Sequence, residues 1–192
     1  MSGDSDLGMS GPPGAGATTV TPSWLFPLVR EVPDFPTPGV RFRDITPVLA
    51  NAEAFHRAVD ELAARFDDEH VDRVVGVEAR GFILAAPIAY RLEASFIPVR
   101  KAGKLPWAVV REEYALEYGR DKLELHRDAI HPDDRVLIID DVLATGGTAV
   151  ATTRLVETLG GRIIGLGALL EVVGLGGRHA LAPKRVEVLA SY

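Results

Sequence analysis

The sequence predicts an α/β domain with a mostly parallel central sheet flanked by helices. Apolar runs without alternation, such as residues 136–139, suit strands that are buried on both faces. Between these runs lie segments whose apolar residues recur at helical spacing. The two kinds of segment alternate along the chain, and such alternation implies parallel strands joined by helices on both faces of the sheet.

The chain is expected to hold one domain at residues 21–192, preceded by a flexible tail. Residues 1–20 are small, polar and rich in Gly and Pro, so they cannot bury enough apolar surface to order themselves. Packed structure is predicted to begin with a short helix from Trp24 to Arg30. A chain of 192 residues suits one domain with a sizeable core.

A turn and two helix signals come next. Asp34–Gly39 has turn composition, and Thr46 is predicted to cap a helix that has Pro47 at its first position. The following helix is amphipathic, and its predicted buried face consists of Phe55, Ala58, Val59, Leu62, Ala63 and Phe66.

The remaining chain alternates regularly except in one segment. We expect strands at 71–77, 95–100, 136–139, 162–170 and 186–190, and helices at 82–92, 148–159 and 178–181. Residues 101–130 form a polar excursion, which in a compact α/β domain usually serves function. Gly165 and Gly167 lack the third glycine of a dinucleotide fingerprint and indicate tight packing in a strand.

Composition excludes several classes of protein. No apolar run approaches the roughly 20 residues that span a bilayer, and no signal peptide is evident. The net charge of −6 argues against binding to nucleic acid or to membrane surfaces. The chain has no cysteine, and the five histidines lack metal-ligand spacing, so no protein metal site is expected. We expect a soluble, cytoplasmic protein.

The most informative segment is 136–148, an apolar run that ends in Asp140-Asp141 and a loop of small residues. Ligands of parallel sheets bind beyond the carboxyl ends of the strands, where this loop lies. Loop amides at a helix N-terminus favour an anion, yet the two acids would repel a simple phosphate. A ribose 5-phosphate satisfies both features. Alternatively, the segment is an ordinary turn in which Asp caps the helix.

Two basic segments also follow predicted strands. Arg80 precedes Gly81 at the start of a helix, so its guanidinium could reach an anion there; taken alone, an arginine at such a turn is more often part of a surface ion pair. Arg100, Lys101 and Lys104 form a basic loop suited to pyrophosphate, or a solvated loop without a ligand.

These segments together resemble the type I phosphoribosyltransferases, and among them the members that act on adenine. The resemblance runs from Asp34 to Tyr192 and rests on five motifs in order. They are Asp-Phe-Pro-Thr-Pro-Gly-Val from 34, Glu-Ala-Arg-Gly-Phe from 78, Arg-Lys-Ala-Gly-Lys-Leu-Pro from 100, Leu-Glu-Tyr-Gly from 116, and the segment 136–148. The resemblance implies the type I phosphoribosyltransferase fold, with a flexible lid and a small N-terminal hood.

The resemblance also implies a reaction and roles for residues. The reaction joins adenine to 5-phosphoribosyl 1-pyrophosphate, giving AMP and pyrophosphate in purine salvage, with Mg²⁺ bound mainly through the pyrophosphate. Asp140 and Asp141 would take the ribose hydroxyls, and the 5-phosphate would lie on Ala144, Thr145, Gly146, Gly147 and Thr148. Arg80, Arg100, Lys101 and Lys104 would bind pyrophosphate, with Arg80 also counted as catalytic.

Further implications concern the base and the assembly. Phe42 and Arg43 would contact adenine, and Glu117 on the lid would manage the proton on the purine ring; Phe42 as a simple core residue is the alternative. The resemblance implies a non-proline cis peptide at Glu78-Ala79 or Ala79-Arg80, and a homodimer. Glu171 and the segment 174–178 would close the base pocket and cap the last helix.

Two other functions stay open. One is transfer to a 6-oxopurine, although such an enzyme should lack the motifs at 78–82 and 116–119. The other is a non-catalytic regulator on the same fold, which would need an element that reads DNA or RNA. Arg41 stands where some relatives have an apolar residue, so the purine-side wall is expected to differ slightly.

Overall fold

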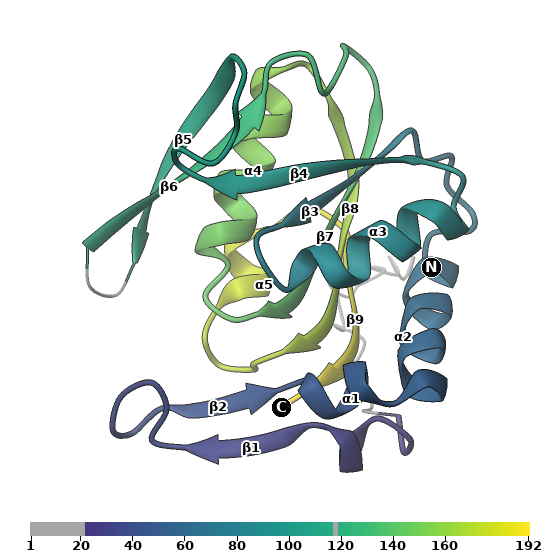
Figure 1. The fold of residues 1–192 in the computed structure, drawn as a ribbon, viewed down its shortest axis with the longest axis vertical. Coiled ribbons are helices and arrows are strands. Elements are labelled where there is room, and N and C mark those ends of the chain that lie inside the picture. The colour runs from purple at the N-terminus through teal and green to yellow at the C-terminus, as the bar shows by residue number, and fades with distance from the viewer. Residues whose placement is uncertain (1–21, 117–118) are drawn as a thin grey trace, which may run out of the picture.

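The computed structural model describes residues 22–116 and 119–192, and these residues form a seven-stranded sheet with helices on both faces (Figure 1). The strand order is β5-β6-β4-β3-β7-β8-β9, and the five strands from β4 to β9 in that order pair in parallel. The predicted fold class is therefore confirmed. The strands are β3 (Arg73–Val77), β4 (Ser95–Lys101), β5 (Val109–Leu116), β6 (Gly119–His126), β7 (Arg135–Leu143), β8 (Arg162–Glu171) and β9 (Val186–Ser191).

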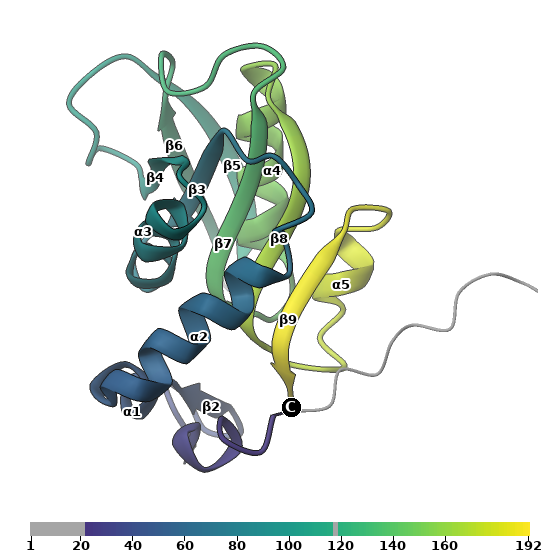
Figure 2. The same ribbon diagram turned by 90° about the vertical axis from the view of Figure 1, so that its right-hand side faces the viewer.

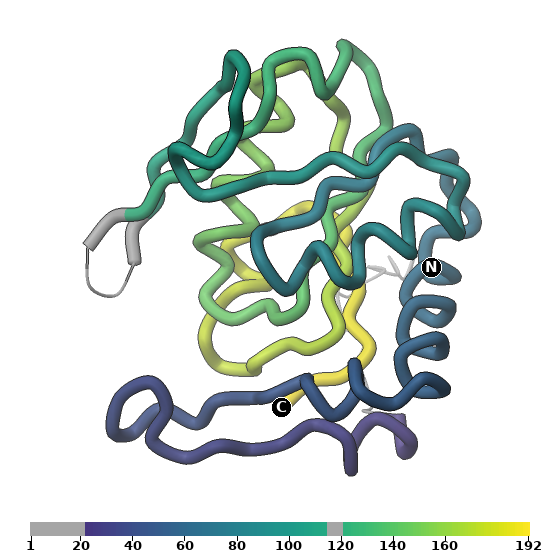
Figure 3. The backbone as a smooth tube through the Cα atoms, viewed as in Figure 1, coloured from purple at the N-terminus to yellow at the C-terminus, as the bar shows by residue number. Residues whose placement is uncertain are grey.

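A separate two-stranded hairpin forms the hood. Its strands are β1 (Arg30–Pro33) and β2 (Arg41–Asp44), which pair antiparallel. The hairpin lies across the end of the sheet where the parallel strands finish (Figures 1 and 3). It thereby covers the edge at which parallel sheets bind ligands.

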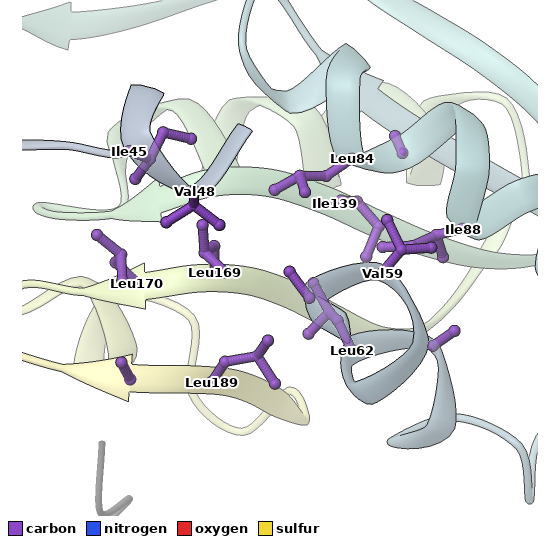
Figure 4. Packing of buried hydrophobic residues seen from close by; sticks show 14 of the residues in the cluster. Ile45, Val48, Val59, Leu62, Leu84, Ile88, Ile139, Leu169, Leu170 and Leu189 are labelled. Atoms are coloured by element: carbon purple, nitrogen blue, oxygen red, sulfur yellow. The ribbon is translucent and has the colours of Figure 1, made fainter. Parts of the chain in front are cut away.

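Two clusters of buried hydrophobic residues lie on opposite faces of the sheet. On one face, α1 (Thr46–Ala50), α2 (Ala52–Ala64) and α3 (Gly81–Arg91) pack against alternate strand residues such as Ile139 (Figures 2 and 4). On the other face, α4 (Gly147–Thr158) and α5 (Gly177–Ala180) pack against Ile138 and its neighbours. Among the described residues, no helix has both the length and the apolar character needed to cross a membrane.

The packing of α2 agrees with the predicted face. Leu62 and Phe66 are fully buried, and the Asn51 side chain accepts a bond from the Ala54 N–H at 3.0 Å to begin the helix. Gly165 in β8 gives room for the aromatic ring, because an added Cβ there would lie 2.5 Å from Phe66 Cε1. Tight packing thus explains this glycine, as predicted.

Two predictions about the N-terminal region were wrong. Thr46 does not cap α1, because its N–H and hydroxyl both donate to Asp44 Oδ1, at 2.9 and 2.5 Å. Ile45 occupies the cap position and provides no side-chain bond. The helix expected up to Arg30 is only the 3-10 turn η1 (Phe26–Leu28), since Arg30 already pairs with Asp44 in the hood.

Two other segments differ in extent. The strand expected at 136–139 continues to Leu143, because Asp140 and Val142 pair with Ala168 and Leu170 of β8. The two acids therefore lie inside the last part of a strand. The polar excursion forms the antiparallel hairpin β5–β6, whose strand β6 pairs antiparallel with β4. The expected tail at 1–20 and Glu117 lie outside the described residues.

Candidate active site

A cavity of about 530 Å³ opens at the carboxyl edge of the sheet, between the hood and the hairpin β5–β6. This volume suits a substrate-sized ligand. The cavity brings together predicted site residues from four separate segments, namely Phe42, Arg43, Arg80, Lys101, Asp140, Asp141, Ala144 and Thr148. Thr145, Gly146 and Gly147 line a second cavity of about 90 Å³, of which Asp140 and Ala144 also form part.

The loop 144–148 turns sharply into α4. Gly146 has φ +84°, a left-handed conformation that a residue with Cβ adopts only at a cost, and it precedes the first helical residue. The first amides of a helix have no partners within the helix, so they are available to an anion. This loop can therefore hold a phosphate at the end of a twelve-residue helix.

The two acids of β7 differ in environment. The Asp141 N–H donates to Asp140 Oδ1 at 2.9 Å, and an added Cβ on Gly81 would lie 2.9 Å from the same oxygen. Burial, together with the neighbouring Asp141 carboxylate, raises the pKa of Asp140 well above its usual range. The site thus contains two adjacent carboxylates, of which Asp141 is only 6% exposed and Asp140 has the raised pKa.

Arg80 joins the acids to the hood. Its Nε lies 2.7 Å from Asp141 Oδ2, although this oxygen accepts no hydrogen bond of good geometry. Its guanidinium carbon lies 5.1 Å from the centre of the Phe42 ring, a cation–π contact. The peptide bond between Glu78 and Ala79 is cis, which confirms the expectation for this loop.

The basic loop contains the end of β4 and is anchored by Glu78. The Lys101 N–H donates to Glu78 Oε2 at 2.9 Å, Lys104 Nζ pairs with Oε1, and Arg100 Nε lies 3.5 Å from Oε2. Lys101 Nζ pairs with Asp121 of β6 at 3.0 Å. The three cations of this loop were predicted, but neither carboxylate was, because Glu78 and Asp121 are 20 or more residues away from the lysines that they pair with.

One wall of the cavity is formed by the hood. The Phe35 and Phe42 rings meet edge to face, with centroids 5.2 Å apart. Arg43 pairs with Glu31 at 2.5 Å and lies over the Tyr192 ring at 4.9 Å. The guanidinium of Arg43 is therefore held by other protein groups, so its backbone atoms are better placed to contact a base than its side chain. Glu31 was not predicted as a site residue because the strand β1 was not expected. Tyr192 was not predicted either.

The segment after β8 supports both the cavity and the phosphate loop. Arg178 donates from Nη2 to Glu171 at 2.8 Å and from Nη1 to the Val186 carbonyl at 2.8 Å. Leu175, which lies between Glu171 and Arg178 in the sequence, lines the cavity. Gly177 lies against the Ala144 carbonyl so closely that an added Cβ would collide with it. The segment 171–178 closes one wall of the cavity. The contact of Gly177 with Ala144 also holds the loop 144–148, called the phosphate loop below, in place.

Comparisons with known proteins decide the family. A profile described as the phosphoribosyl transferase domain matches residues 48–186. The adenine phosphoribosyltransferase of Roseiflexus castenholzii is 54% identical over 158 residues, which cover 82% of this chain and 92% of that protein. This chain belongs to the adenine phosphoribosyltransferase family.

Solved structures of adenine phosphoribosyltransferases have the same fold. The crystal structure of the enzyme from Thermoanaerobacter pseudethanolicus has a TM-score of 0.86 and 46% identity, covering 88% of this chain and 98% of that one. The enzyme from Saccharomyces cerevisiae, solved with an imino-altritol bisphosphate and adenine, has a TM-score of 0.82 and 36% identity, covering 86% and 96%. The described cavity therefore belongs to an adenine phosphoribosyltransferase fold.

Proposed function

We propose that this chain transfers the 5-phosphoribosyl group from 5-phosphoribosyl 1-pyrophosphate to adenine, giving AMP and pyrophosphate in purine salvage. One observation carries the proposal within the family: a single cavity contains the acids of β7, the cations Arg80 and Lys101, and the hood residue Phe42. Each of these groups suits a different part of the two substrates.

The sugar is assigned to the end of β7 and the loop behind it. Asp140 and Asp141 accept hydrogen bonds from the ribose hydroxyls, while Ala144, Thr145, Gly146, Gly147 and Thr148 hold the 5-phosphate. Breaking the bond to pyrophosphate makes the ribosyl centre cation-like, as in glycoside hydrolysis. The nearby carboxylates offset this charge as it develops.

The leaving pyrophosphate is assigned to Arg80, Arg100, Lys101 and Lys104. Mg²⁺ bound to the pyrophosphate would neutralise further negative charge. The oxygen atoms of pyrophosphate suit this ion, since Mg²⁺ prefers oxygen ligands and keeps much of its water. Within residues 22–116 and 119–192, no three His, Cys, Asp or Glu side chains group closely enough to hold a metal ion.

Adenine is assigned to the hood. Stacking on Phe42 contributes roughly 1–3 kcal/mol by analogy with other stacked bases. Backbone atoms near Arg43 supply the hydrogen bonds that select the base edge, consistent with the engaged guanidinium of that residue. The segment 172–176, with Leu175 at the cavity wall, closes the pocket from the other side.

Glu117 is assigned to proton management at the purine ring. A general acid or base contributes about 10²–10⁴-fold, so Glu117→Gln should lower turnover by that factor without changing thermal stability. Closure of the hairpin tip over the sugar would also exclude water, which otherwise captures the ribosyl cation. Unchanged turnover in this variant would remove the assignment.

We also infer that the chain forms a homodimer. Its cytoplasmic location stays a prediction. Support comes from α3, where Ile83 and Tyr90 are seven residues apart on one helical face and are 41% and 89% exposed. Light scattering of the purified protein should give twice the chain mass of 20.7 kDa. A mass that stays at one chain at all concentrations would contradict the dimer.

The test of function is AMP formation from adenine and the ribosyl donor with Mg²⁺, with hypoxanthine, guanine and xanthine as competitors. We expect turnover with adenine and weak competition from the 6-oxopurines. Preferred turnover of hypoxanthine or guanine would establish the 6-oxopurine alternative. No turnover with any base would favour a regulator on the same fold.

A further inference from the structure

Acidic side chains pair with all four cations assigned to pyrophosphate, and Arg100 shares Glu78 with Lys104. Arg80 pairs with Asp141 at 2.7 Å, Lys101 with Asp121 at 3.0 Å, and Lys104 with Glu78. Asp141 has its own role toward the sugar. Glu78 has no such role, yet it contacts more of the basic loop than either of the others.

Glu78 lies directly after β3 and beneath the basic loop. Its side chain is only 9% exposed, whereas that of Lys104 is 45% exposed. The carboxylate contacts the Lys101 N–H, Arg100 and Lys104 together. One nearly buried carboxylate thus holds the loop from below, while the lysine ammonium reaches it from the solvent side.

The electrostatics keep Glu78 ionised. Burial alone raises its pKa, but the bonds from Lys104 and from the Lys101 N–H lower the pKa of Glu78 below its usual value. A poorly solvated carboxylate is costly without its cations. Pyrophosphate that takes Lys104 must therefore separate it from Glu78, and it also meets repulsion from the same carboxylate.

We propose that Glu78 is a positioning residue that competes with pyrophosphate for Lys104, holding the cation in the empty site and limiting the affinity for the product. The inference rests on the proposed function. A tightly held polyanionic product would leave slowly, and release of product limits turnover in many enzymes. The competing carboxylate makes Lys104 available without letting it bind pyrophosphate at full strength.

The backbone of the loop has anchors besides Glu78. The Gly103 N–H donates to Glu124 Oε2 at 2.8 Å, and Glu124 is 2% exposed and paired with Arg111. Arg100 Nη1 donates to the Lys104 carbonyl at 3.2 Å. Loss of the Glu78 charge should therefore free the Lys104 ammonium while the loop keeps its course.

The test is Glu78→Gln, which keeps the size of the side chain and can still accept from the Lys101 N–H. Inorganic pyrophosphate with Mg²⁺ is titrated into the full chain by calorimetry, and its inhibition of AMP formation is measured. We expect pyrophosphate to bind roughly fivefold more tightly, a ratio within the range of one ion pair, with AMP affinity unchanged. Damage to the structure would weaken binding, so tightening identifies competition.

Two variants serve as controls. Glu124→Gln removes a carboxylate of β6 that anchors the same loop without touching Lys104, so it should not tighten pyrophosphate binding. In a Lys104→Met background, Glu78→Gln should lose most of its effect, because only the repulsion by the carboxylate and its contact with Arg100 remain. If Glu78→Gln does not fold, Glu78→Asp replaces it, because the shorter side chain draws its charge away from Lys104 and should also tighten binding.

Weaker or unchanged pyrophosphate binding in the Glu78 variant would overturn the inference, as would tightening of the same size in the Lys104→Met background. Failure of the proposed function looks different, because the unmodified chain would then neither bind pyrophosphate nor form AMP. If the unmodified chain does both and Glu78→Gln does not tighten binding, only the role of Glu78 is wrong.

Discussion

Asp140 is the residue at which stability and activity are most directly opposed. Burial and the adjacent Asp141 carboxylate raise the pKa of Asp140, which means that the folded protein disfavours its ionised form. A residue with no function would not be kept in such a place, and sites that break the rules of stable packing are commonly functional. The carboxylate suits a sugar whose charge becomes positive.

We predict that Asp140→Asn makes the empty protein more stable and less active. Removing the poorly solvated charge should raise the melting temperature at pH 7 by ~2–4 °C, the change expected for about 1 kcal/mol in a chain of this length. Loss of electrostatic stabilisation should lower kcat for AMP formation about 10²-fold. Thermal melts by circular dichroism and steady-state kinetics measure the two effects.

The pH dependence provides the control. An acid whose pKa is raised on folding destabilises the protein above that pKa, and the penalty disappears as pH falls to the ordinary carboxyl range. The gain in Asp140→Asn should therefore shrink as the pH is lowered toward 4. A variant that melts no higher at pH 7, or a double variant Asp140→Asn with Asp141→Asn that keeps full activity, contradicts this account of the acids.

At the scale of elements, the phosphate loop depends on its contact with α5. Gly177→Ala would place a methyl group against the Ala144 carbonyl and Leu143, so the loop must move. We predict a rise of roughly tenfold in KM for the ribosyl donor, because displacement of a positioning element by about 1 Å can cost up to 10²-fold. The KM for adenine should change less.

Gly174→Ala is the matched control. Gly174 has φ +91° and open space around it, so the substitution strains the backbone by about 1 kcal/mol without touching the phosphate loop. It should lower the melting temperature and leave KM for the donor unchanged. Equal effects of both substitutions on the donor would show that the Gly177 contact has no special role.

The elements also show what the sequence can predict. The face of α2 and the strands β3, β4, β7, β8 and β9 were predictable, because the helical spacing and apolar runs are local properties. Thr46 was mistaken for a cap since the competing acceptor Asp44, only two residues earlier, captures both its N–H and its hydroxyl. Strand β1 has no apolar alternation, and it exists because it pairs with β2.

The site was predictable to a similar extent. Motif composition indicated Asp140, Asp141 and Arg80, and the parallel sheet places them in one cavity. The pairs that hold the cations were not predictable. Glu78 meets Lys104, and Glu31 meets Arg43, only after strands distant or unrecognised in the sequence come together.

For the whole molecule, buried acids dominate the response to low pH. Burial raises the pKa of Glu124, but hydrogen bonds from the Gly103 N–H and Arg111 lower it below its usual value. Burial likewise raises the pKa of Asp134, and bonds from the His131 N–H and Arg73 lower it. An acid whose pKa is lowered on folding stabilises the folded protein at pH values above its pKa in the unfolded chain. This stabilisation is lost as the pH falls through its pKa in the folded protein.

The free energy of unfolding should therefore decline below about pH 4, close to the ordinary carboxyl range. Denaturant titrations between pH 7 and pH 3 measure this decline. Glu124→Gln should be less stable than the unmodified protein at pH 7, and the difference should narrow at pH 3. A difference that is independent of pH would show that the charge of Glu124 does not contribute.

The assignment of substrate parts to the cavity is the central claim, and a crystal structure with adenine, Mg²⁺ and an unreactive analogue of the ribosyl donor tests it most directly. We expect the 5-phosphate on residues 144–148, the hydroxyls at Asp140 and Asp141, the pyrophosphate mimic near Arg80, and adenine on Phe42. A donor analogue bound away from residues 144–148, or adenine bound away from the hood, would contradict the account.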